Sequence, residues 1–265
     1  MFKDITLGQY FPGNSAIHRL DARTKILLMM LYIVEIFLIR ELWLFAPAAA
    51  FVLGVALLAR VPIKVMLNAI KPLRFLLIFM FVINLVFIHG EKVLFEFWVI
   101  RVTEESVAQA FYILFRLMLL VIGTSLMTLT TSPISLTDGI ERMLSPLKRI
   151  KFPAHELAMM MTIALRFIPT LIEEADKITK AQLARGADFE SGGVIKRAKS
   201  MIPVLVPLFV SAFRRADELA MAMESRCYHG GEGRTRMRVL RLGWNDAIAA
   251  AACLGLLSLI IFAQR

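Results

Sequence analysis

The chain has 265 residues, of which 58% are apolar and 20% are charged. Soluble globular domains are roughly 45–50% apolar. This higher apolar fraction indicates that most of the chain lies in a membrane rather than in water. The formal net charge is +10, from 31 Lys and Arg against 21 Asp and Glu. The sequence shows no basic-aromatic recognition module, Cys/His metal spacing or low-complexity arm, which argues against nucleic acid as the partner of that charge.

Five apolar stretches predict an all-α integral membrane protein. A helix needs about 20 apolar residues to cross the ~30 Å hydrocarbon core, and lipid admits an isolated segment only as a helix. The first stretch is short, so we expect it to use flanking residues or to thin the bilayer. No small-residue cleavage pattern follows it, so we expect it to remain in the protein. The predicted spans are residues 26–39, 42–59, 73–89, 107–129 and 247–263.

The distribution of Lys and Arg predicts the orientation of these spans. The first 25 residues and the loop after the second span are basic, whereas residues 91–105 contain four Glu. Because cytoplasmic loops are enriched in Lys and Arg, we expect a cytoplasmic N terminus. The predicted organisation is a cytoplasmic segment (1–25), four membrane helices (26–130), a cytoplasmic region (131–245) and a C-terminal membrane helix (246–265).

The region 131–245 predicts three helices with apolar stripes, and such stripes need a partner surface. The first starts at Ser132-Pro133, a capping residue followed by proline in the first turn. The second covers residues 154–185 and the third 194–228, with kinks expected at Pro203 and Pro207. Gly186 stands where a left-handed residue would end the second helix.

Two of these helices finish in a tripeptide centred on arginine. The tripeptides are Ala184-Arg185-Gly186 and Ser225-Arg226-Cys227. An arginine near a helix C terminus interacts favourably with the helix dipole, by roughly 0.3–1 kcal/mol, and this structural role alone could explain each one. The repeat in position favours a shared function.

The chain resembles the transmembrane T component of energy-coupling factor transporters, which are bacterial vitamin importers, over nearly its whole length. The resemblance is carried by short motifs in a specific order: Gly8-Gln9-Tyr10-Phe11-Pro12, Ser15, His18-Arg19-Leu20-Asp21-Ala22-Arg23-Thr24-Lys25, Leu165-Arg166-Phe167-Ile168-Pro169 and Gln182-Leu183-Ala184-Arg185-Gly186. It implies a multi-pass protein of the bacterial cell membrane. It also implies that Arg185 and Arg226 each enter a groove of one ATPase subunit. The second tripeptide departs from the family's alanine-arginine-glycine pattern, but serine and cysteine are also small.

The resemblance implies a division of labour. Two ATP-binding cassette ATPases would lie on the cytoplasmic side, and a small membrane subunit, the S subunit, would capture the vitamin or metal and set the specificity. We therefore expect no catalytic residue, metal site or cofactor in this chain, with ATP on the partners. Consistent with that expectation, the sequence has no GxxxxGK[ST] phosphate loop and no nucleophile elbow. The alternatives are a secondary transporter, which should show paired halves, and a membrane-anchored interaction protein without ATPase partners.

Several polar residues lie in apolar stretches, where they need an ion-pair or hydrogen-bond partner. Glu35 and Arg116 lie within predicted spans, where an isolated charge costs at least about 2.5 kcal/mol, so we expect an ion pair between them or contact with the S subunit. Asn84 could join helices, and His89 is expected at the interface.

Arg166 lies in the predicted cytoplasmic region, as does Cys227, whereas Cys253 lies in the last predicted span. Arg166 is expected to bond nearby carbonyls or to pair with Glu173 or Glu174. Cys227 and Cys253 are expected to be free thiols, because neither a disulfide framework nor a zinc site is indicated.

Overall fold

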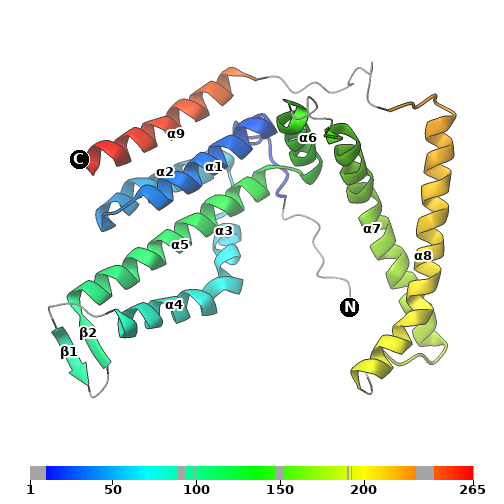
Figure 1. Ribbon diagram of the computed structural model, residues 1–265, viewed down its shortest axis with the longest axis horizontal. Coiled ribbons are helices and arrows are strands. Elements are labelled where there is room, and N and C mark those ends of the chain that lie inside the picture. The colour runs from blue at the N-terminus through cyan, green and yellow to red at the C-terminus, as the bar shows by residue number, and fades with distance from the viewer. Residues whose placement is uncertain are drawn as a thin grey trace. The chain divides into compact units, whose positions relative to one another are not determined.

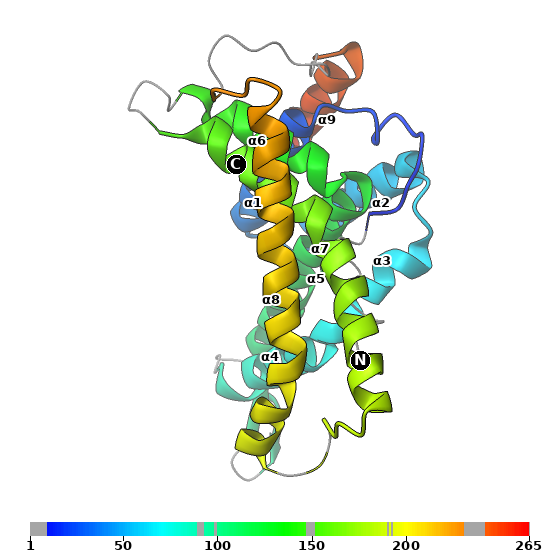
Figure 2. The ribbon, with the colours of Figure 1, turned by 90° about the vertical axis from the view of Figure 1, so that its right-hand side faces the viewer.

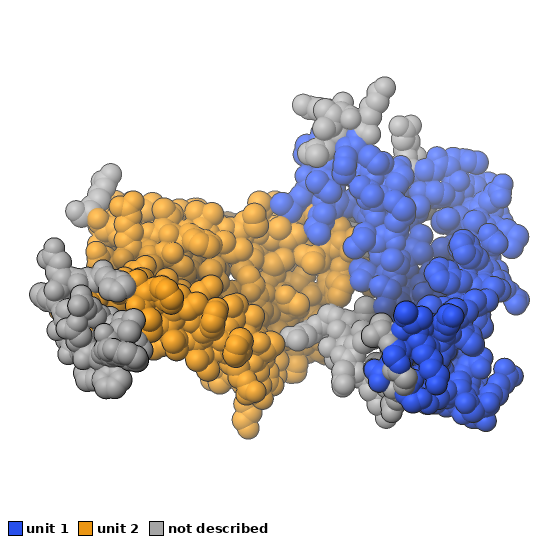
Figure 3. Space-filling model, turned by 60° about the horizontal axis from the view of Figure 1, so that its bottom comes forward, with its two compact units in different colours: residues 1–7, 140–238 blue, residues 8–139, 239–265 orange. Residues whose placement is uncertain are grey.

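The computed structural model describes residues 10–88, 93–97, 100–146, 152–189, 191, 193–230 and 242–264. The described chain is mostly helical (Figure 1). It divides into two compact units, coloured separately in Figure 3. We call residues 8–139 and 239–265 the bundle unit, and residues 1–7 and 140–238 the hairpin unit.

The bundle unit is built around one long helix, α5, which contacts α1, α2, α3 and α4, while α9 contacts α1 and α2. Two short 3-10 helices, η1 and η2, precede α2 and α4. The elements are α1 (Ala22–Leu38), η1 (Leu42–Leu44), α2 (Phe45–Ala59), α3 (Ile63–Ile70), η2 (Lys71–Leu73), α4 (Arg74–Phe87), β1 (Val93–Phe97), β2 (Ile100–Thr103), α5 (Glu104–Thr130) and α9 (Trp244–Ala263).

The prediction of an all-α membrane protein is confirmed, with one small addition. The strands β1 and β2 form an antiparallel hairpin in which Val93 faces Thr103 and Phe97 faces Ile100. This hairpin lies within residues 91–105, the acidic segment between the third and fourth predicted spans. Thr103 then caps α5, because its side chain accepts a hydrogen bond from Ser106 N.

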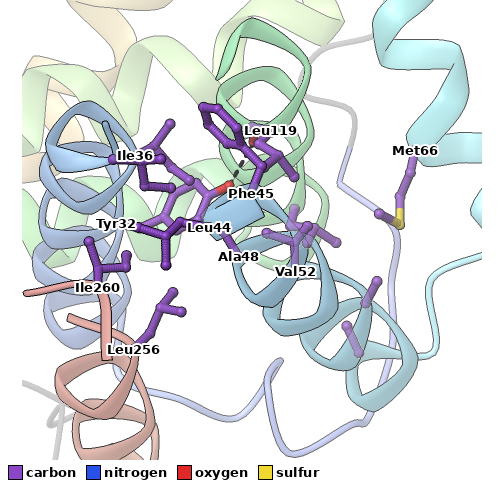
Figure 4. Close-up of a cluster of buried hydrophobic side chains, with 14 of the residues drawn as sticks. Tyr32, Ile36, Leu44, Phe45, Ala48, Val52, Met66, Leu119, Leu256 and Ile260 are labelled. Atoms are coloured by element: carbon purple, nitrogen blue, oxygen red, sulfur yellow. Dashed lines mark hydrogen bonds between the residues drawn. The ribbon is translucent and has the colours of Figure 1, made fainter. Parts of the chain in front are cut away.

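The core of the bundle unit lies between α1, α2, α5 and α9 (Figure 4). Tyr32 crosses it and donates a hydrogen bond from its hydroxyl to Leu119 O over 2.8 Å. Its ring lies directly on the backbone of Gly123, where an added Cβ would be 2.2 Å from Tyr32 Cε1. Only glycine allows this approach. The labelled core side chains are Tyr32, Ile36, Leu44, Phe45, Ala48, Val52, Leu119, Leu256 and Ile260, with Met66 of α3 at the edge.

The first helix is short, at 17 residues or about 25 Å, and side chains from its neighbours satisfy its last carbonyls. Arg116 Nη2 donates to Ile39 O over 3.1 Å, and Tyr112 also donates to Ile39 O. Gln264 Nε2 donates to Leu38 O over 3.0 Å. These donors come from α5 and from the end of α9. The carbonyl groups at the end of this short helix therefore have hydrogen-bond partners where water is absent.

The predicted ion pair between Glu35 and Arg116 is wrong. Arg116 caps α1 instead, with its guanidinium 4.5 Å from the ring centroid of Tyr112. Glu35 is fully buried and accepts a hydrogen bond from Cys253 Sγ over 3.3 Å. The two charged residues have separate roles, because α1 ends close enough to Arg116 for its carbonyls to be the nearer acceptors.

Polar residues at the start of α1 tie together three ends of the bundle. Lys25 Nζ donates to Thr130 O at the end of α5 over 2.7 Å. Asp246, in the first turn of α9, accepts hydrogen bonds from Asp21 N over 2.9 Å and Gly243 N over 2.7 Å. The starts of α1 and α9 and the end of α5 therefore meet at one end of the bundle.

The segment that precedes α1 is held by His18. Its Nδ1 lies 2.8 Å from Ser15 Oγ and its Nε2 lies 3.0 Å from Phe11 O. Phe11 N in turn donates to Leu129 O over 2.9 Å. These contacts explain why Ser15, His18, Asp21 and Lys25 occur together in one short motif.

Five helical segments in the described chain are long and apolar enough to cross a membrane, judged by length and composition. They are Leu42–Ala59, Ile63–Phe87, Glu104–Thr130, Ala154–Ala184 and Trp244–Ala263. The set differs from the predicted spans, because α1 is shorter than the others and a helix of the region 131–245 takes its place. The placement of that region in the cytoplasm stays a prediction. Asn84 bonds Met80 O of its own helix over 2.7 Å rather than a neighbouring helix, and His89 lies outside the described residues.

The hairpin unit contains α7 (Ala154–Ala184) and α8 (Val194–Glu224), and α6 (Pro133–Leu144) crosses the division between the units. The predicted start of α6 is confirmed, since Ser135 N donates to Ser132 Oγ over 3.2 Å. Helices α7 and α8 run antiparallel and contact each other (Figures 1 and 2). Pro203 and Pro207 both lie inside α8.

An ion pair between Arg215 and Glu174 joins the two long helices. Arg215 Nη2 of α8 lies 2.9 Å from Glu174 Oε2 of α7, and Arg215 Nη1 donates to Thr170 Oγ1 over 3.2 Å. The predicted pairing of Arg166 with Glu174 is therefore wrong. Arg166 is exposed, and α8 brings Arg215 to Glu174 from 41 residues away.

Two arginines at equivalent helix ends

The first arginine tripeptide ends α7 in a Schellman motif. Ala187 N donates to Gln182 O over 3.0 Å, and Gly186 N donates to Leu183 O over 3.0 Å. Gly186 has φ +88°, the left-handed conformation that such an ending requires. Arg185 is the C-cap residue, and its side chain is exposed.

The second tripeptide ends α8 in the same motif. Tyr228 N donates to Met223 O over 3.1 Å, and Cys227 N donates to Glu224 O over 2.9 Å. Cys227 has φ +55° and takes the place that Gly186 has after α7. Arg226 therefore occupies the backbone position that Arg185 occupies, and it too is exposed.

The departure from alanine-arginine-glycine to serine-arginine-cysteine thus changes the residues but not the backbone. Left-handed conformation costs a residue with a Cβ roughly 1–2 kcal/mol. Among the described residues, Arg60 and Cys227 are the non-glycine residues with positive φ. The sequence locates the second tripeptide but not its conformation, because cysteine does not indicate a left-handed turn as glycine does.

The antiparallel arrangement of α7 and α8 sets the two arginines at opposite ends of the hairpin (Figures 1 and 2). Each helix has 31 residues, or about 46 Å at 1.5 Å per residue. The structure therefore does not bring the predicted site residues together. It presents two separate sites of the same geometry, which suits two copies of one kind of partner.

Each site exposes a positively charged guanidinium group to the surroundings of the helix end. Within the described chain neither guanidinium makes a hydrogen bond or an ion pair. A free guanidinium offers a planar set of donors that matches a carboxylate pair. The described residues hold no cluster of His, Cys, Asp or Glu suited to a metal. Cys227 and Cys253 are both free thiols, as predicted.

Comparison with known proteins bears directly on these features. A family model described as cobalt transport protein (CbiQ) matches residues 13–237, which include both tripeptides. The chain belongs to this family.

Curated members related to this chain are named energy-coupling factor transporter transmembrane protein EcfT. The protein of Thermosediminibacter oceani is 55% identical to this chain, over 97% of this chain and 96% of its own length. The protein of Acidaminococcus fermentans is also 55% identical, over 99% of this chain and 97% of its own length. That of Bacillus subtilis is 45% identical over 99% of both chains. With these relatives and its apolar helices, this CbiQ-family chain is a transmembrane component of a transport system, as the sequence predicted.

Proposed function

We propose that this chain is the scaffold through which two ATP-binding cassette ATPases drive a membrane subunit that captures a vitamin or other micronutrient. ATP binds to the partners, and this chain carries Arg185 and Arg226 to one ATPase each. The observation that supports this proposal is the pair of identical helix ends, each with an exposed arginine, at opposite ends of one helical hairpin. The proposed setting is the bacterial cell membrane, with the N terminus in the cytoplasm.

The hairpin suits a mechanical role. Helices are stiff along their axes, and the Arg215–Glu174 ion pair with its Thr170 hydrogen bond joins α7 to α8. When the ATPases close on ATP, they would draw both helix ends with them. The hairpin would then respond by rigid-body repacking, in which no covalent bond is made or broken.

Charge reversal at both arginines tests this proposal. The variant Arg185→Glu, Arg226→Glu should insert in the membrane normally but lose the ATPases on purification in mild detergent, because a carboxylate replaces the donor that an acidic groove would bind. Each single variant should lose part of the bound ATPase and most ATP-driven uptake. The readouts are subunit stoichiometry by mass spectrometry and ATP hydrolysis of the eluate.

The matched control is Arg214→Glu, which makes the same charge change on α8 away from its end. Arg214 is exposed, and among the described residues its partner is Glu218, in an i,i+4 ion pair worth about 0.3–0.5 kcal/mol. Normal assembly and uptake by the double variant would rule the proposal out. A chain that purifies alone and transports after reconstitution would instead support a secondary transporter. Capture of other proteins without ATPases would support the interaction-protein alternative.

A further inference from the structure

A second feature of the bundle unit lies away from the arginine tripeptides. It is a pocket of about 560 Å³ between α1, α2, α5 and α9. Its lining is almost entirely apolar and includes Leu28, Phe51, Val55, Leu126 and Ala252. Water is a poor occupant of such a space, because it would find too few polar partners there. A void would forfeit dispersion contacts over the whole lining.

The polar part of the lining gathers where helices begin or end. Lys25 is near the start of α1, Thr130 is the last residue of α5, and Asn245 is in the first turn of α9. The contribution of α2 comes from the second half of that helix and ends at Leu58, just before the exposed Arg60. The pocket therefore occupies the half of the bundle nearest the basic N-terminal segment.

Two cations at this end can meet an anion: Lys25, which lines the pocket, and Arg60, which is exposed just beyond it. Lys25 is 8% exposed, and its ammonium group contacts two carbonyl oxygens, Thr130 O at 2.7 Å and His18 O at 3.4 Å. Of the nearby acids, Asp246 uses both carboxylate oxygens to accept backbone N–H groups, and Asp21 is paired with Arg23 at 2.8 Å. An ammonium group has three N–H donors, so one remains for a ligand.

We propose that this pocket holds one acyl chain of an anionic membrane lipid, with the headgroup phosphate beside Lys25 and Arg60. Hydrocarbon is the apolar material that a bilayer supplies, and basic residues at the cytoplasmic surface attract anionic lipids. The lining is apolar along its length and polar only where helices begin or end, which matches an acyl chain below a charged headgroup.

Gly54 of α2 provides a direct test. It lines the pocket, and a Cβ built on it meets no atom within 4 Å, so the backbone leaves room for a larger side chain to start there. Gly54→Phe is expected to direct its ring into the pocket. The matched control is Gly255→Phe on α9, where a Cβ also meets no atom within 4 Å but which does not line the pocket.

The protein is purified in mild detergent from its native membrane with its co-purifying subunits, and is then exchanged into discs containing phosphatidylglycerol or phosphatidylcholine. Lipid retained after detergent washing is counted by native mass spectrometry. Wild type and Gly255→Phe should keep one phosphatidylglycerol. Gly54→Phe should keep at least about tenfold less, since every methylene excluded from the pocket loses its burial.

Three outcomes would overturn the proposal. Equal phosphatidylglycerol retention in both glycine variants would mean that the lipid binds elsewhere. Equal retention of phosphatidylcholine and phosphatidylglycerol by wild type would remove the role of Lys25 and Arg60. If Gly54→Phe keeps its lipid but loses a membrane subunit, the pocket belongs to that protein partner. Because none of these readouts depends on Arg185 or Arg226, failure here would leave the proposed coupling function untouched.

Discussion

At the scale of single residues, the same backbone position is filled in two ways. Gly186 adopts its left-handed conformation without steric cost, whereas Cys227 adopts it with a Cβ. The peptide groups around both residues form the same pair of hydrogen bonds. The position of the arginine is therefore set by the helix ending, and the residue after it decides how firmly that ending holds.

Substitution of Cys227 should change the stability of the α8 end. Cys227→Gly should slow amide hydrogen exchange at residues 227 and 228, whereas Cys227→Val should speed it, because a branched side chain is worst in the left-handed region. The penalty at stake is about 1 kcal/mol, or about fivefold in exchange rate. Exchange by mass spectrometry provides the measurement, with the amides at 186 and 187 as an internal control. Identical exchange in the glycine and valine variants would contradict this account.

At the scale of elements, the long helices depend on contacts that their own sequences do not contain. The face of α7 near Glu174 receives Arg215 from α8, and the last carbonyls of α1 receive Arg116 from α5 and Gln264 from α9. A buried or half-buried partner brought from another helix is worth more than a neighbour on the same exposed face, because it is less screened by solvent.

A double-mutant cycle can measure the hairpin contact. Replacing Arg215 and Glu174 singly and together by Ala should give a coupling free energy of about 0.5–1 kcal/mol, since these side chains are 35% and 26% exposed. The same cycle on Arg214 and Glu218, 80% and 58% exposed, should give about 0.3 kcal/mol. Thermal unfolding in detergent gives the values. A larger coupling for the exposed pair would refute the assignment of Arg215 as the link between α7 and α8.

At the scale of the whole molecule, the end of the bundle near Lys25 joins segments that are distant in the chain. Lys25 reaches Thr130, 105 residues on, and Asp21 reaches Asp246, 225 residues on. Lys25 precedes the first predicted span. Burial lowers the pKa of its ammonium group to about 8, and the charge of Asp246 opposes part of that shift.

This lowered pKa predicts a pH dependence of stability. Unfolded lysine has a pKa near 10.4, so between about pH 8 and pH 10 the unfolded chain binds more protons at Lys25 than the folded chain does. The free energy of unfolding should therefore rise with pH over that window. Comparing the melting temperature of wild type and Lys25→Met in lipid-free detergent from pH 7 to pH 10 isolates this group. Parallel curves for the two proteins would show that Lys25 does not contribute.

The sequence by itself determined most of the long helices and where several of them begin and end, although it treated α3 as part of a loop. Residues Ser132 and Pro133 located the start of α6, and Gly186 located the end of α7, because capping and left-handed turns depend on adjacent residues. The motif from Ser15 to Lys25, which carries part of the family resemblance, could also be recognised from the sequence. Its residues are close together in the chain, and they hold the start of α1 in place.

Only the tertiary structure decided which side chains meet. Arg116 caps α1 rather than pairing with Glu35, Glu174 pairs with Arg215 rather than Arg166, and Lys25 bonds the end of α5. Cys227 is a separate case, because it reproduces the turn of Gly186 within its own helix end and cysteine does not indicate a left-handed residue. The physical reason is distance along the chain: a cap is specified by neighbours within one turn, whereas these partners are 41 to 105 residues apart and meet only after the helices have packed.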